Sequence, residues 1–189
     1  MEEDWGLFSS DLESEMKKIL GSKSDSWELV IEDLKSKDKG SLKPEVYKEV
    51  LEELEKMLSV GPLKEEGNLY LGFEYDLNFL LLELSTYGYE KAKALRYVNK
   101  VIGLEPFRVD LYLIKSSILE MEKDFEGAHQ VLETAWSLEP QNYEVNLSIV
   151  ENLAEMRKYG EAADFIIDSR LEKSEKLKLL DVLDRLRDG

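Results

Sequence analysis

The sequence contains no cysteine, only one histidine (His129), and no apolar run that approaches the roughly 20 residues of a membrane-spanning helix. Without cysteine, the chain has no disulfide framework, no thiolate zinc site and no cysteine nucleophile. A lone histidine leaves it without the usual metal ligands and without the most frequent general base. Glycine-rich phosphate loops and the HExxH and GxSxG motifs are also missing. We therefore expect a protein that is not an enzyme, with no catalytic residues, no cofactor and no metal site.

Positive charge is scarce as well. The 25 lysines and arginines face 41 aspartates and glutamates, which gives a net charge of −16. Such a charge repels phosphate backbones and anionic lipid surfaces. The first residues, MEEDWGLFSSDLE, are acidic where a signal peptide would be basic. We expect a cytoplasmic protein that binds neither nucleic acid directly nor a membrane, and no feature indicates a homo-oligomer.

Apolar residues recur at spacings of three and four along almost the whole chain, and alternation with a period of two is scarcely visible. This periodicity is typical of amphipathic helices and predicts an all-α fold. A glycine- and proline-containing joint, GPLKEEGN, is expected at 61–68. The expected helices cover about 10–21, 26–35, 44–60, 71–86, 89–103, 108–121, 124–137, 142–156, 158–171 and 174–187.

The tripeptide Leu-Glu-Pro occurs at 104–106 and again at 138–140, an interval of 34 residues. Twelve residues before each proline stands an alanine, Ala94 or Ala128, and a third alanine, Ala162, follows after another 34 residues. Small residues at fixed places allow two helices to approach closely, and proline suits the first turn of a helix or the link before it. The 34-residue interval therefore indicates a repeated helical hairpin.

Aromatic residues near the turns fit this repeat less well. Phe125 of the second copy corresponds to Tyr159 of the third, but in the first copy Gly88-Tyr89 lies two residues from the place of Asp124-Phe125. The second half of the motif therefore repeats well, and its beginning slips in the first copy.

The pattern resembles the tetratricopeptide repeat family, whose unit is a 34-residue helix-turn-helix. The resemblance covers about residues 72–172, and its best copy is 109–142, with Tyr112 where the family favours a large aromatic residue. It implies antiparallel helix pairs stacked in a right-handed superhelix; the alternative is an irregular helical bundle. The departures from the family pattern are Asn78 and Leu82 in the first copy and Asn146 and Ser174 in the third.

The repeats define an expected division of the chain. An N-terminal helical section (1–62) would be either degenerate repeats or a separate bundle, and the repeats would occupy 63–172. The last segment (173–189) would be a capping helix, with one apolar face for the last repeat and one polar face for water. The apolar stripe of that helix is expected to comprise Leu177, Leu180, Leu183 and Leu186.

In the tetratricopeptide family, the first helix of each pair lines a concave groove that holds a peptide or a partner helix. Carried over, the groove residues would be Asp76, Phe79, Glu83, Asp110, Leu113, Ser117, Glu120, Met121, Glu144, Leu147, Glu151 and Glu155. Carboxylates dominate this set, with an apolar thread through it, and such a cleft would favour a segment bearing lysine or arginine with hydrophobic anchors. The alternative is that these carboxylates form a solvated face.

The resemblance implies an adaptor that binds a basic and hydrophobic peptide or helix of another protein in an acidic groove. One alternative is a regulatory or structural subunit of a larger enzyme or nucleic-acid-processing complex that acts through its outer face. A further alternative is an acidic mimic of nucleic acid. His129 is expected to be an exposed or partly buried helix residue rather than a catalytic base, and Trp5, Trp27 and Trp136 are expected to contribute to packing.

Overall fold

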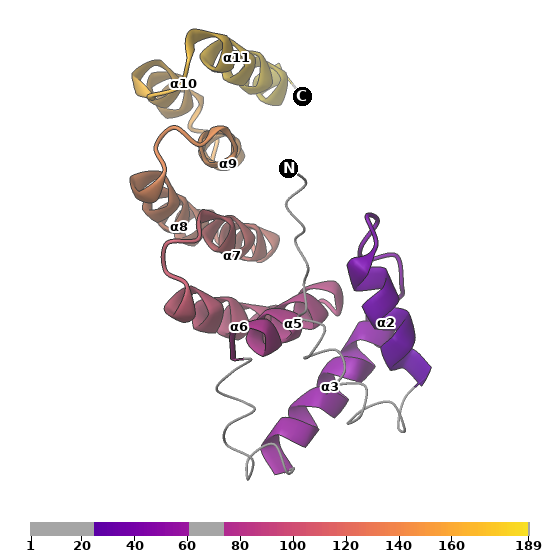
Figure 1. Cartoon of the computed structure of the whole chain (residues 1–189). Coiled ribbons are helices and arrows are strands. Elements are labelled where there is room, and N and C mark those ends of the chain that lie inside the picture. The colour runs from indigo at the N-terminus through magenta and orange to yellow at the C-terminus, as the bar shows by residue number, and fades with distance from the viewer. Residues whose placement is uncertain (1–24, 61–73, 189) are drawn as a thin grey trace. The chain divides into compact units, whose positions relative to one another are not determined.

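The computed structural model describes residues 25–60 and 74–188, and every regular element within these stretches is a helix (Figure 1). The prediction of an all-α fold is confirmed. The expected helix at 10–21 and the joint at 61–68 lie outside the described residues. The bounds are α2 Asp25–Lys35, α3 Pro44–Val60, α5 Glu74–Tyr87, α6 Lys91–Leu104, α7 Val109–Met121, α8 Phe125–Leu138, α9 Tyr143–Glu155, α10 Tyr159–Asp168 and α11 Lys173–Asp188.

The chain divides into two compact units, one ending at Leu104 and the other beginning at Glu105. The first unit holds α2, α3, α5 and α6, and the second holds α7 to α11. Among the helices that the structure describes, none is both long and apolar enough to cross a membrane.

In the first unit, α2 packs on α3, α3 packs on α5, and α5 packs on α6. The apolar faces expected for α2 and α3 are buried: Trp27, Val30, Ile31 and Leu34 on α2, and Tyr47, Val50, Leu51 and Leu54 on α3. The core of this unit therefore follows from the spacing of apolar residues in each helix.

The loop between α2 and α3 is closed by the buried carboxylate of Asp33. The backbone N–H groups of Gly40 and Ser41 donate to it at 2.8 and 3.1 Å, and the hydroxyls of Ser41 and Tyr47 donate to it as well. Burial raises the pKa of Asp33, but these hydrogen bonds outweigh burial and hold the pKa below the ordinary aspartate value. Gly40 has a φ of +85°, and a Cβ there would lie 2.8 Å from the ring of Tyr87, so glycine is required at this position.

Glu55 on α3 joins that helix to α6. Its carboxylate accepts hydrogen bonds from Lys93 Nζ (2.7 Å) and the Tyr97 hydroxyl (2.5 Å), and it also pairs with Arg96. Burial raises the pKa of Glu55. The hydrogen bonds from Lys93 and Tyr97 and the charges of Lys93 and Arg96 together lower it by more, so the pKa lies below the ordinary glutamate value. One carboxylate thus fixes the register between two helices.

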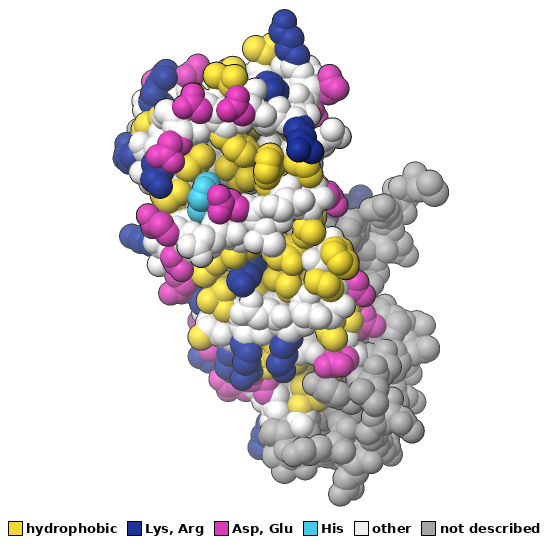
Figure 2. Space-filling model, turned by 90° about the vertical axis from the view of Figure 1, so that its left-hand side faces the viewer, with side chains coloured by type: hydrophobic (Ala, Val, Ile, Leu, Met, Phe, Trp, Pro, Cys, Tyr) yellow, Lys and Arg dark blue, Asp and Glu magenta, His cyan; other side chains and the backbone are white. Residues whose placement is uncertain are grey.

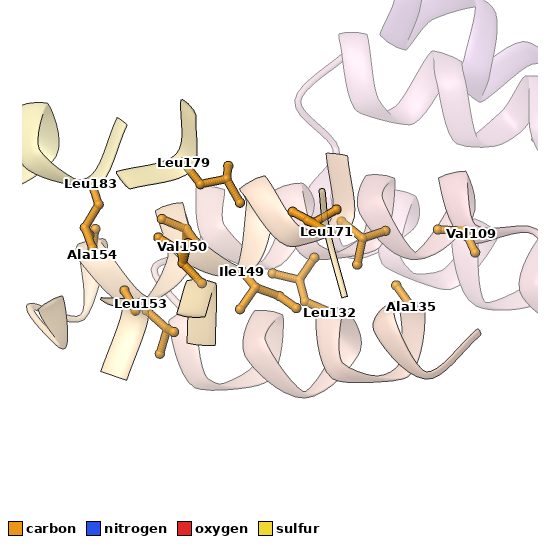
Figure 3. Packing of buried hydrophobic residues seen from close by; sticks show 13 residues of the cluster. Val109, Leu132, Ala135, Ile149, Val150, Leu153, Ala154, Leu171, Leu179 and Leu183 are labelled. Atoms are coloured by element: carbon orange, nitrogen blue, oxygen red, sulfur yellow. The ribbon is translucent and has the colours of Figure 1, made fainter. Parts of the chain in front are cut away.

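In the second unit, successive helices form adjacent antiparallel pairs (Figure 1). Helix α9 is central because it packs on α8, α10 and α11. Its buried residues include Val145, Ile149, Val150 and Leu153, which meet Leu132 of α8 and Leu179 of α11 in one hydrophobic cluster (Figure 3). This cluster is the core of the unit.

Helix α11 packs on α9 and α10, as a terminal cap requires, but it turns a different face to them than expected. Leu179 and Leu183 are buried, whereas Leu177 and Leu186 are exposed by 57% and 39%. The predicted stripe is therefore wrong at its two ends.

Helix α10 ends at Asp168, earlier than the expected residue 171. Ser169 has an extended backbone (ψ 159°), and Leu171 enters the core outside any helix.

The turn inside each hairpin repeats along the chain at the level of the backbone. Tyr89, Lys123 and Arg157, which are spaced by 34 residues, are the non-glycine residues with positive φ in the described part of the chain, at 56°, 62° and 61°. The N–H groups of these residues donate to Thr86 O (3.1 Å), Glu120 O (2.8 Å) and Ala154 O (2.9 Å) respectively. The turn of the first copy thus keeps the 34-residue interval, although its aromatic side chain lies two residues from the corresponding place.

Burial repeats with the same interval on the second helix of each pair. Ala94, Ala128 and Ala162 are almost completely inaccessible, and so are the larger residues four positions later, Val98, Leu132 and Ile166. Pro106 and Pro140 lie in the links before α7 and α9 rather than in the helices. The packing of adjacent pairs is consistent with a helical-repeat arrangement.

We expect Lys123→Gly to raise the free energy of unfolding by about 0.5–1 kcal/mol, because glycine adopts a positive φ without the Cβ clash that costs a lysine roughly 1–2 kcal/mol. Urea unfolding of the full chain, followed by far-ultraviolet circular dichroism, measures this change. The matched control is Lys178→Gly in the interior of α11, which should lower stability by about 1 kcal/mol. Equal destabilisation by both substitutions would contradict the assignment of a strained turn.

Candidate functional site

The twelve residues expected to line a groove are divided between the two compact units. Asp76, Phe79 and Glu83 lie on α5 in the first unit, and the other nine lie on α7 and α9 in the second. Each set is described within its own unit.

On α5, the three residues are partly buried and each has neighbours of its own. Phe79 stacks on Tyr75 with ring centroids 5.9 Å apart. Burial raises the pKa of Asp76. Glu83, with a side chain only 12% exposed, accepts a hydrogen bond from Lys39 Nζ at 3.2 Å. This pairing was not visible in the sequence, because Lys39 lies in the polar turn after α2, which gave no sign of contacting α5.

Glu83 is the carboxylate most affected by its surroundings. Burial raises its pKa to about 7, although the charge and hydrogen bond of Lys39 act in the opposite direction. Its second oxygen, Oε2, is buried and has no hydrogen-bond partner in the described part of the chain. Near neutral pH Glu83 is therefore only partly ionised, and it is already bonded to Lys39, so it is a weak candidate for binding a further cation.

On α7 and α9, the apolar members of the predicted groove rest on the core. Leu113 and Leu147 are partly buried and pack against the hydrophobic cluster of the unit, and Met121 at the end of α7 is 44% exposed. The hydroxyl of Ser117 donates to Leu113 O within its own helix at 3.1 Å. The two leucines thus link the surface of α7 and α9 to the core.

The carboxylates of α7 and α9 differ in their partners. Asp110 pairs with Arg108, and Glu144 is exposed in the first turn of α9. Glu120 accepts a hydrogen bond from Asn152 Nδ2 at 3.0 Å, and the same Nδ2 donates to Phe125 O at 3.1 Å. Asn152 is completely buried on α9, so it fixes Glu120 against the turn between α7 and α8.

Glu120, Glu151 and Glu155 form a set of interacting negative charges. Partial burial raises the pKa of Glu120, and the charge of Glu155 raises it further despite the hydrogen bond from Asn152. Loss of hydration raises the pKa of Glu151, and the charge of Glu120 adds to the shift. Within 25–60 and 74–188, no lysine or arginine forms an ion pair with any of the three.

We call Leu113, Glu120, Leu147, Glu151 and Glu155 the acidic α7/α9 surface. The sequence pointed to all five, but it gave no indication of Asn152, which holds Glu120 in place. Its burial became visible only in the structure. Among the described residues, no group of three or more His, Asp or Glu side chains is arranged to hold a metal ion.

The sequence matches no protein-family model, and no curated protein sequence is significantly similar to it.

We expect the stability of the first unit to fall as pH rises, because the folded state holds the proton of Glu83 more tightly than the unfolded chain, in which the ordinary pKa is 4.5. The stabilisation is complete below the unfolded value and is lost as pH approaches and passes about 7, a fall of about 3 kcal/mol. Glu83→Gln cannot ionise and should abolish this dependence.

Native-state hydrogen exchange of the α5 amides at about pH 5 and about pH 8 measures the effect, since it reports the opening free energy of that helix. The control is Glu32→Gln, which alters an exposed carboxylate on α2 and should leave the pH dependence as in the wild type. A wild-type stability that does not change between the two pH values would exclude a raised pKa for Glu83.

Proposed function

We propose that this protein is a non-enzymatic adaptor and that its acidic α7/α9 surface binds a segment of another protein that carries lysine or arginine beside apolar residues. In this proposal, α5 to α10 are three tetratricopeptide-like repeats. The 34-residue recurrence of the left-handed turns, their hydrogen bonds and the buried alanines supports that part of the proposal.

The observation that carries the proposal is the convergence of Glu120, Glu151 and Glu155 without a basic partner. Their mutual repulsion and reduced hydration raise the pKa of Glu120 and of Glu151, so ionising this surface costs free energy in the unbound protein. A bound ammonium or guanidinium group would remove the repulsion and replace the lost hydration. The carboxylates therefore gain more from a cationic partner than isolated surface carboxylates would.

The apolar part of the surface supplies anchors for the same segment. Leu113 on α7 and Leu147 on α9 are supported from below by the hydrophobic cluster, so they present fixed rather than mobile apolar area. Binding energy in interfaces comes mainly from a few such well-supported contacts, while charges at the rim increase the association rate and the specificity. An amphipathic helix with lysines beside leucines matches this arrangement.

We expect a fluorescent helical peptide of lysine and leucine to bind the protein, and Glu151→Lys combined with Glu155→Lys to weaken binding about tenfold or more. Both residues are exposed, so the substitutions leave the core intact. Fluorescence anisotropy at low and high salt measures the affinity. Binding should also strengthen as pH rises through the range in which Glu120 and Glu151 ionise, because the cation binds their charged forms.

The control variant is Asp164→Lys combined with Glu172→Lys, which makes the same change in net charge at exposed positions on α10 and before α11. It should bind the peptide nearly as well as the wild type. An equal loss in both double variants would show a response to net charge alone. No loss in either would exclude the α7/α9 surface as the binding site.

A further inference from the structure

A pocket of about 370 Å³ opens between α8, α9 and α10, on residues that the acidic α7/α9 surface does not use. Its lining includes Ile149 and Leu153 of α9, which are buried and form an apolar floor. This volume lies at the lower end of the roughly 300–1,000 Å³ range of small-molecule and side-chain pockets. The pocket is therefore large enough for one long side chain and the backbone next to it.

One wall of the pocket is aromatic. Trp136 of α8 and Phe165 of α10 meet edge to face, with ring centroids 6.2 Å apart and an angle of 61° between the rings. An aromatic face attracts a cation through its quadrupole, and arginine uses such faces more often than lysine does. The apolar floor and this wall together accommodate a ligand with flat or aliphatic parts.

The rim of the pocket is acidic. Glu133 of α8 and Glu161 and Asp168 of α10 are exposed, and none of them pairs with a lysine or arginine in the stretches that the structure describes. Figure 2 shows the histidine side chain beside acidic side chains on this face, next to a strip of hydrophobic side chains. The rim therefore selects against anions and favours a cation.

Two nitrogen atoms of the pocket walls, Trp136 Nε1 and His129 Nδ1, are buried and have no hydrogen-bond partner in the described part of the chain. Buried polar atoms in native proteins almost always have a partner, so two orphans beside one pocket need an explanation. Among the residues that the structure describes, none forms a hydrogen bond that holds either ring in its present orientation.

We propose that this pocket binds an arginine side chain of a partner protein. The guanidinium lies against the Trp136 and Phe165 rings and donates to the carboxylates of the rim. Arginine fits better than lysine because its planar group stacks on an aromatic wall while its five donors reach more than one carboxylate. This proposal is independent of the function proposed for the acidic α7/α9 surface, because the pocket and that surface share no residue.

The chain provides its own reporters for the test. His129 is the single histidine and Trp136 is one of three tryptophans, so the imidazole and indole resonances are few, and Trp136→Phe identifies the indole signal of Trp136. The probe is the peptide acetyl-Gly-Arg-Gly-amide, titrated into the full chain labelled with nitrogen-15. The comparison probe contains citrulline, which has the shape of arginine without the charge.

We expect the arginine peptide to shift the resonances of Trp136 and His129 with a dissociation constant on the order of 1 mM, which is typical of a single anchoring side chain. The citrulline peptide should shift them little at the same concentration. Glu133→Gln combined with Asp168→Asn keeps the shapes of the rim side chains and should weaken binding about fivefold or more. Glu151→Gln combined with Glu155→Gln removes the same charge from the α7/α9 surface and should leave the dissociation constant unchanged.

Three results would overturn the proposal. Equal shifts with the arginine and citrulline peptides would show that the positive charge does not contribute to binding in the pocket. Equal weakening by the two double variants would assign the effect to the overall charge of the protein. Shifts confined to α7 and α9 amides, with Trp136 and His129 unmoved, would place the arginine on the acidic α7/α9 surface instead, which would leave the function proposed for that surface standing.

Discussion

The close approach of two helices at a buried small residue is the constraint on which each repeated hairpin depends. Ala94, Ala128 and Ala162 occupy that place in the second helix of each pair, where a larger side chain would force the helices apart. The turn before each alanine has to bring the chain back within a few residues, and it does so through one residue with positive φ. None of these helices can bury its apolar face alone, and a hairpin needs neighbouring helices to complete its core.

Helix α9 shows how this packing produces two different surfaces from one element. Ile149 and Leu153 are buried in the core and also form the floor of the pocket beside α8 and α10. Glu151 and Glu155, two residues further along in each case, are exposed and interact with Glu120 of α7. Residues two positions apart on a helix point in very different directions, so one short sequence supplies both the pocket and the acidic surface.

The excess of negative charge serves different purposes in the two units. In the first, Glu55 and Glu83 are paired with lysine or arginine, and these pairs connect α3 with α6 and the α2–α3 loop with α5. In the second, the carboxylates of the acidic α7/α9 surface and of the pocket rim have no basic partner among the described residues. A buried pair mainly fixes the geometry of the fold, whereas an unpaired group of carboxylates remains available for a cation from another molecule.

The sequence by itself determined the helical class, the helix boundaries to within a few residues and the 34-residue interval, because helix formation depends on residues three and four positions apart. In the first copy the aromatic side chain is two residues from its expected place, whereas the backbone hydrogen bonds of the turn keep the 34-residue interval. The sequence misplaced the buried stripe of α11, since the neighbouring helices α9 and α10 decide which leucines are covered. Only the tertiary structure decided which side chains meet. The pairs Lys39–Glu83 and Glu120–Asn152 join residues 44 and 32 positions apart, and the pocket forms between three helices. These contacts depend on how the helices pack, which the spacing of residues within one helix does not predict.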